Sequence, residues 1–206
     1  AGSSLTTWAL GQVEAGRQTL RLIDSKLSGQ HLFPELSLFD CHACHHTMSD
    51  KKWTQQDRIN LPPGTVRLND VGFLMLYPIA KTFAPSQYNN LHSGLQALHQ
   101  QANAGGDISG ILKRLENTLD MLSASISDNT NSQIASEIMA QLIAMGTDGK
   151  FLDYIAAEQA VMAIGMLLST SSKKDDHSDW LDSLYDSVQD ENAYDPAQLV
   201  KVMRRH

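Results

Sequence analysis

Both cysteines of the chain, Cys41 and Cys44, lie in one short stretch, FDCHACHH, at residues 39–46. The order Cys-x-x-Cys-His is the attachment signature of c-type haem. In that chemistry the two thiols add to the vinyl groups of the haem, and the histidine is the proximal ligand of the iron. The stretch therefore predicts haem c attached to Cys41 and Cys44, with His45 as the iron ligand.

A short helix would bring these three side chains together, because each residue of an α-helix advances about 100°. With Cys41 at zero, Cys44 falls at about −60° and His45 at about +40°, so one porphyrin could meet all three. His42 and His46 fall at about 100° and 140°, away from that face. We therefore expect His45, and not His46, to be the proximal ligand.

The same residues have alternative uses. A disulfide between Cys41 and Cys44 could form in an oxidising compartment, but a thioredoxin-like redox pair belongs near a βαβ pattern, and none is apparent in the sequence. A zinc site would crowd four ligands into six residues, and structural zinc sites usually draw a second ligand pair from farther along the chain. A chance match is the remaining alternative. The haem signature is favoured because it uses all the cysteine that the chain has.

The sixth ligand of such an iron is not identified by spacing. Histidine and methionine are the usual axial ligands, and each candidate taken singly is better explained as a surface or core residue. The candidates are His31, His46, His92, His99 and His177, with Met75 and Met48 as softer ligands, of which Met48 is too close to the motif to reach the far side of the porphyrin.

Three further side chains could contact the haem. Arg67 follows a Pro-Pro-Gly turn and could pair with a haem propionate, since guanidinium groups suit carboxylates. The alternative for Arg67 is a solvated surface charge. Phe39 and Trp53 are expected to pack near the porphyrin and keep water away.

Charge and hydropathy narrow the class of protein. The formal net charge of −7 argues against nucleic-acid binding, which needs a basic face. No apolar run approaches the length of a transmembrane helix. Haem attachment to this motif follows export in bacteria, so we expect a periplasmic or otherwise exported protein whose signal sequence is not part of this chain.

Helical periodicity runs through most of the sequence, and no stretch alternates with period two for long. We expect an all-α fold, an irregular bundle of about seven to nine helices, in a single domain over 1–206 with a haem-bearing part (1–85) and a helical scaffold (86–206). Helices are expected near 4–28, 69–79 with an interruption at Pro78, 85–104, 107–122, 134–145, 152–168, 179–189 and 195–204.

Three segments of the chain resemble the sequences of a known family. They are ALGQV at 9–13, FPELSLFDCHACHH at 33–46 and KWTQ at 52–55. Together they are similar to the C-terminal region of bacterial multihaem c-type cytochromes related to the cytochrome c-554 family. The resemblance implies haem c on Cys41 and Cys44 with His45 as ligand, and a role for His46 at a neighbouring haem. Such proteins carry several upstream motifs, whereas this chain carries one.

The expected function is therefore electron transfer by a haem c domain, with redox proteins or neighbouring haem domains as partners. No set of nucleophile, base and acid stands out, so we expect an electron carrier and no catalytic residues. Two other classes stay open. One is a haem-based sensor or enzyme with an open sixth iron position, and the other is a helical interaction module without haem.

Overall fold

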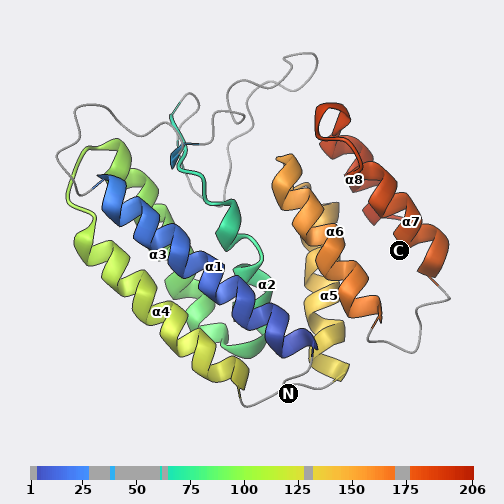
Figure 1. The fold of residues 1–206 in the computed structure, drawn as a ribbon, viewed down its shortest axis with the longest axis horizontal. Coiled ribbons are helices and arrows are strands. Elements are labelled where there is room, and N and C mark those ends of the chain that lie inside the picture. Colours follow the sequence, from blue (N-terminus) through green and yellow to red (C-terminus); the bar gives the residue numbers. More distant parts are fainter. Residues whose placement is uncertain (1–3, 28–37, 40–60, 62–64, 128–131, 170–176) are drawn as a thin grey trace. The chain divides into compact units, whose positions relative to one another are not determined.

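The computed structural model describes residues 4–27, 38–39, 61, 65–127, 132–169 and 177–206, and these are almost entirely helical (Figure 1). No β-strand occurs in this part of the chain, where one isolated antiparallel bridge joins Phe39 and Leu68. The all-α prediction is confirmed. The described residues form eight α-helices: α1 (Ser4–Leu27), α2 (Leu76–Phe83), α3 (Pro85–Asn103), α4 (Ser109–Ser127), α5 (Ser132–Thr147), α6 (Tyr154–Ser169), α7 (Ser178–Ser187) and α8 (Pro196–Met203).

The chain forms two compact units. The central unit is Gly11–Ser125, and the C-terminal unit combines Ala1–Leu10 with Ile126–His206. The boundaries fall inside α1 and α4. Within the central unit α2 packs against α3, so these helices join the expected haem-bearing part to the expected scaffold. The division of one domain after residue 85 stays a prediction.

The core of the central unit forms where α1 approaches α2 and α4. A Cβ atom at Gly16 of α1 would lie 2.9 Å from a methyl carbon of Leu76 and 3.5 Å from one of Leu119. Leu76 and Leu119 are fully buried. Glycine weakens a helix interior by about 0.5–1 kcal/mol relative to alanine, and here its missing side chain admits the neighbouring leucines. Beside this contact, Arg17 forms an ion pair with Asp120 of α4.

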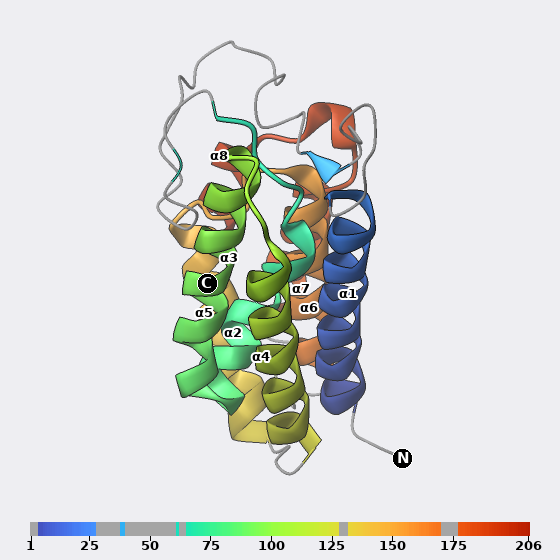
Figure 2. The same cartoon turned by 90° about the vertical axis from the view of Figure 1, so that its left-hand side faces the viewer.

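Helices α3 and α4 form an antiparallel pair in the central unit (Figure 2). A Cβ atom at Gly94 of α3 would lie 2.6 Å from Leu115 of α4, which shows how closely the two helices approach. Gly105 ends α3 with a φ of 66°, a left-handed conformation that costs glycine little. The amide of Gly106 then donates to the carbonyl of Gln101 over 3.0 Å, as in the Schellman ending of a helix.

The run expected to be helical from residue 69 is divided. A 3₁₀ turn, Val71–Phe73, precedes α2, and Asn69 Oδ1 accepts a hydrogen bond of 3.4 Å from the Val71 amide. The side chain of Asp70 makes no such capping bond. Pro78 lies in the first turn of α2, where an amide has no partner within the helix. The division predicted from Pro78 is therefore confirmed, and it falls just before the proline.

In the C-terminal unit α5 packs against α6 and α8, and α7 packs against α6 and α8. The buried face of α6 includes four alanines and Gly165. Trp180 Nε1 of α7 donates to the carbonyl of Val202 over 2.9 Å. Asp195 caps α8 by accepting from the Ala197 amide. None of the helices in the described part of the chain combines the length and apolarity that a membrane crossing needs.

Leu115→Ala in the central unit and Ile138→Ala in the C-terminal unit should each lower the free energy of unfolding by about 2–5 kcal/mol, because the lost side chain leaves a cavity. Leu115 is 1% exposed and Ile138 is 0% exposed. Urea denaturation followed by circular dichroism measures the change. Met121→Ala, at a side chain that is 54% exposed, is the control and should shift stability by no more than about 0.5 kcal/mol. Equal stability of the Leu115→Ala and Met121→Ala variants would contradict the packing of α4.

Candidate functional site

The motif residues Cys41, Cys44 and His45 lie outside the described residues, as does His46. Three other candidates, His31, Met48 and Trp53, also lie outside them. Their predicted roles stay predictions. The structure does describe the two residues that precede Asp40 and the motif, and the central unit holds them in place.

Leu38 and Phe39 are bound to the chain segment that precedes α2. The carbonyl of Leu38 accepts a hydrogen bond of 2.7 Å from the Asn69 amide, and Phe39 forms an antiparallel bridge with Leu68. Leu38 is 3% exposed and Leu68 is 1% exposed. Leu38 is therefore part of the buried core of this unit, and the half-buried Phe39 is joined to it through the bridge with Leu68.

Behind Leu68 lies a buried histidine, His99 of α3, with both ring nitrogens in use. The Leu68 amide donates to Nδ1 over 3.4 Å, and Nε2 lies 3.2 Å from Asp70 Oδ2. Because Nδ1 accepts, Nε2 carries the hydrogen and donates to the carboxylate. His99 is 0% exposed. Because both ring nitrogens form hydrogen bonds, neither is available to bind an iron, and this argues against His99 as the sixth ligand.

A third buried polar side chain, that of Arg67, lies beside Asp70. Its Nε lies 3.9 Å from Asp70 Oδ1, three residues along the chain. Arg67 is 5% exposed and Asp70 is 2% exposed. The alternative interpretation of Arg67 as a solvated surface charge is therefore wrong, because the guanidinium is buried beside a carboxylate. Its pairing with a haem propionate stays a prediction. Opposite charges are buried at lower cost together than apart.

A further contact ties the cluster to α3. Asn103 Nδ2 donates to the carbonyl of Val66 over 2.9 Å and to the carbonyl of His99 over 2.8 Å. One end of α3 thus holds the segment 66–70 at two points, His99 and Asn103. We call Arg67, Asp70 and His99 the buried charge cluster.

The other ligand candidates lie elsewhere. His92 is half-buried, stacks on Tyr88 with 6.4 Å between ring centroids, and meets the ring of Tyr77 edge-on. Met75 is 1% exposed. His177 belongs to the C-terminal unit, where its ring stacks on His206 at 4.9 Å. Burial, and secondly the neighbouring His177, lower the pKa of His206.

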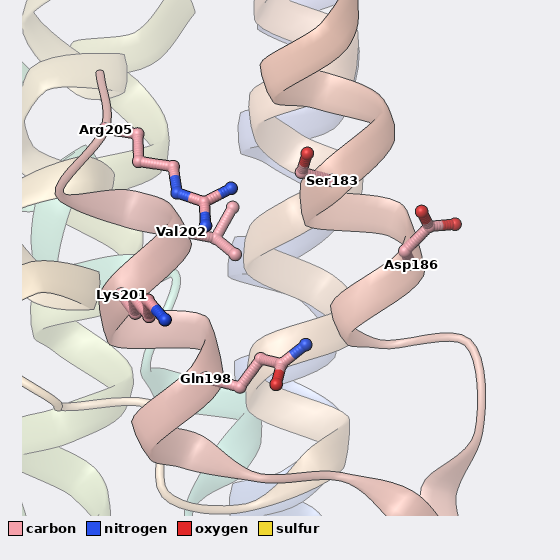
Figure 3. A pocket seen from close by; sticks show the side chains of 6 residues that line it. All are labelled: Ser183, Asp186, Gln198, Lys201, Val202 and Arg205. Carbon is pink, nitrogen blue, oxygen red and sulfur yellow. The ribbon is translucent and has the colours of Figure 1, made fainter.

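Two hollows are open to solvent. One, of about 210 Å³, lies between α7 and α8 in the C-terminal unit. Figure 3 shows Lys201 of α8 and Arg205, just beyond the end of that helix, across from Ser183 and Asp186 of α7. The other, of about 460 Å³, lies between α3 and α4 in the central unit and is lined mainly by amide and hydroxyl side chains. In the first hollow the Ser183 hydroxyl donates to the backbone carbonyl of Asp179 over 2.8 Å. The described residues contain no group of three or more side chains suited to a metal ion.

The buried charge cluster was not predicted from the sequence. Arg67 was expected to pair with a haem propionate or to face solvent, and His99 was one of several candidate iron ligands, each better explained as a surface or core residue; the structure places His99 in the core. One signal was present, the spacing of three between Arg67 and Asp70. No sequence pattern predicted the contact between Asp70 and His99, which lie 29 positions apart, because tertiary packing brings them together.

His99→Phe should lower the free energy of unfolding by about 2–6 kcal/mol, because the buried Leu68 amide and the Asp70 carboxylate would each lose a hydrogen-bond partner at about 1–3 kcal/mol. The matched control is His92→Phe, two turns earlier on the same helix, which keeps an aromatic ring beside Tyr77 and Tyr88 and should lower stability less than His99→Phe, because its position is only half-buried. Urea denaturation measures both. A larger loss for His92→Phe than for His99→Phe would disprove the bridging role of His99.

No protein-family model, curated protein or solved structure matches the chain. The case for a function therefore depends on the motif residues and on the contacts of the central unit.

Proposed function

We propose that the chain is a c-type cytochrome domain that carries one covalently bound haem and transfers electrons. The observation that carries the proposal is the sequence CHACH at residues 41–45, which contains both cysteines of the chain. Cys41 and Cys44 would form the two thioether bonds, and His45 would bind the iron. The redox partners would be other electron-transfer proteins or neighbouring haem domains.

The donor set fits haem c, because it supplies two thiols at the attachment spacing and an imidazole directly after the second. When bound, haem supplies a one-electron couple between ferric and ferrous iron. The chain's own contribution is to anchor the group, to supply the proximal imidazole and to control its access to water. The buried Leu38 and Leu61, on either side of the motif, are 3% and 8% exposed, which supports attachment against the core of the central unit.

The chemistry of haem attachment predicts where in the cell the protein is located. Attachment of haem c to this motif takes place after export in bacteria, so the proposal includes a periplasmic or otherwise exported protein. The formal net charge of −7 suits docking to a basic redox partner. The sixth ligand would come from His31, His46, His92 or Met75. An open sixth position would instead make the iron a gas-binding centre, and binding of carbon monoxide by the reduced protein would detect it.

Intact mass provides the first test. Protein matured in a bacterial periplasm should carry the mass of one haem, and the haem should survive acid–acetone extraction and denaturing electrophoresis. Cys41→Ser/Cys44→Ser should lack it, because no thioether can form. A wild-type protein that loses all haem on extraction would exclude covalent attachment.

The second test concerns the proximal ligand. His45→Ala should change the absorption spectrum of the iron far more than His46→Ala, because helical spacing would place only His45 on the face of the two cysteines. The two variants alter neighbouring residues of one stretch and so control for each other. Equal spectral changes would mean that the assignment of His45 is wrong or that the stretch is not helical.

A further inference from the structure

We propose that α7 and α8 form the interface of a two-fold symmetric dimer of this chain, in which an acidic row of each copy lies against a basic row of the other. The acidic row is Asp179, Asp182 and Asp186 of α7, and the basic row is Lys201 of α8 with Arg205 just beyond its end. The partner is a second copy of the same chain, and the inference does not rest on the proposed haem.

Each row follows the spacing of one helix face. Asp182 and Asp186 are four residues apart, as are Lys201 and Arg205, so the members of a pair are neighbours on their helix. All four side chains are exposed. Figure 3 shows α7 and α8 running in opposite directions, with Asp186, Lys201 and Arg205 around the same hollow. The two rows therefore flank this hollow on one surface of the C-terminal unit.

The charges of the two rows are not neutralised within the described part of the chain, where no ion pair involves any of them. Charges of the same sign four residues apart destabilise an isolated helix, and each helix carries such a pair. Asp186 also lies in the last turn of α7, where the negative end of the helix dipole disfavours a carboxylate. Opposite charges from outside the protomer would offset these costs.

A second copy of the chain supplies both sets of opposite charges at once. A two-fold axis that runs along the hollow, parallel to the two helices, places α7 of each copy over α8 of the other, and the two contacts are then equivalent. Each acidic row meets the basic row of the partner. A partner with charges of a single sign would be attracted by one row and repelled by the other, so self-association fits this surface better.

The surface is small, and its size limits the affinity. Helices α7 and α8 have 10 and 8 residues, and the area that they bury is expected to fall below about 1,600 Å², the size of a standard interface. The formal net charge of −7 repels a second copy, but charges more than about 8 Å apart are largely screened at physiological ionic strength. We therefore expect a weak dimer whose affinity depends on the close ion pairs.

Sedimentation equilibrium of the full chain, at physiological ionic strength, measures the dissociation constant of the dimer. Lys201→Glu/Arg205→Glu reverses the basic row, and Asp182→Lys/Asp186→Lys reverses most of the acidic row. Each double variant then carries mainly one sign of charge on both helices, so its self-association should weaken by about tenfold or more. An equimolar mixture of the two variants should regain a dimer about as tight as that of the wild type, because each supplies the charges that the other has lost.

The overall charge of the chain predicts a different result. Asp182→Lys/Asp186→Lys brings the negative net charge closer to zero, so a dimer limited by overall repulsion would tighten, whereas the dimer of facing rows weakens. Lys150→Glu and Glu137→Lys are the matched controls, because both side chains are exposed in the same unit and lie outside the rows. Each control should leave the dissociation constant unchanged.

Circular dichroism checks that each variant keeps its helices. If a reversed variant does not, Lys201→Gln/Arg205→Gln or Asp182→Asn/Asp186→Asn takes its place, and should weaken the dimer by a smaller factor. Neutral variants that leave the dissociation constant at the wild-type value would overturn the inference.

The other outcomes are distinct. Weaker dimers of both reversed variants, with a restored dimer in their mixture and unchanged controls, would establish the interface. A wild-type chain that stays monomeric at millimolar concentration would overturn it, and so would a dimer that neither reversal weakens, since that dimer would use another surface. A mixture that does not regain the wild-type affinity would also overturn it, because the two rows would then not face each other. Intact mass tests haem attachment separately, so a failure of the proposed function and a failure of this inference are distinguishable.

Discussion

The central unit depends on one imidazole that forms hydrogen bonds with two buried polar groups. His99 accepts from the Leu68 amide and donates to the Asp70 carboxylate, with no exposed surface of its own. A buried amide or carboxylate without a partner costs more than a hydrogen bond gains, so the segment 66–70 has one stable place against α3. Leu38 and Phe39 are then held by the backbone of that segment.

This arrangement explains why a polar cluster occurs inside an otherwise apolar unit. The surrounding core is made of leucines such as Leu91, Leu95 and Leu119, and apolar packing alone is tolerant of small shifts in register. Directional hydrogen bonds from His99 and Asn103 give the segment before α2 a defined position. The haem attachment that we propose would make use of such a defined entry to the motif.

The two units differ in the contacts that stabilise each of them internally. In the central unit, glycines admit leucines of the neighbouring helices at Gly16 and Gly94, and a buried cluster of charges fixes the non-helical segment. The C-terminal unit is joined by apolar faces and by single side-chain bonds to the backbone, such as that from Tyr194 to the carbonyl of Phe151. Burial, with secondary contributions from Asp153 and Asp195, raises the pKa of Tyr194, so its hydroxyl stays a donor.

Local signals in the sequence determined the helices. The period of apolar residues, the Gly105–Gly106 ending and the Asp195–Pro196 start act over a few residues, so the all-α class and most helix limits followed from the chain alone. The haem signature is local in the same sense, because attachment chemistry needs five consecutive residues. Only the tertiary structure decided that Arg67 is buried beside Asp70, and that His99, 29 residues away from Asp70, binds that carboxylate. Contacts between segments far apart in the sequence depend on how the helices pack, and no short sequence pattern predicts them.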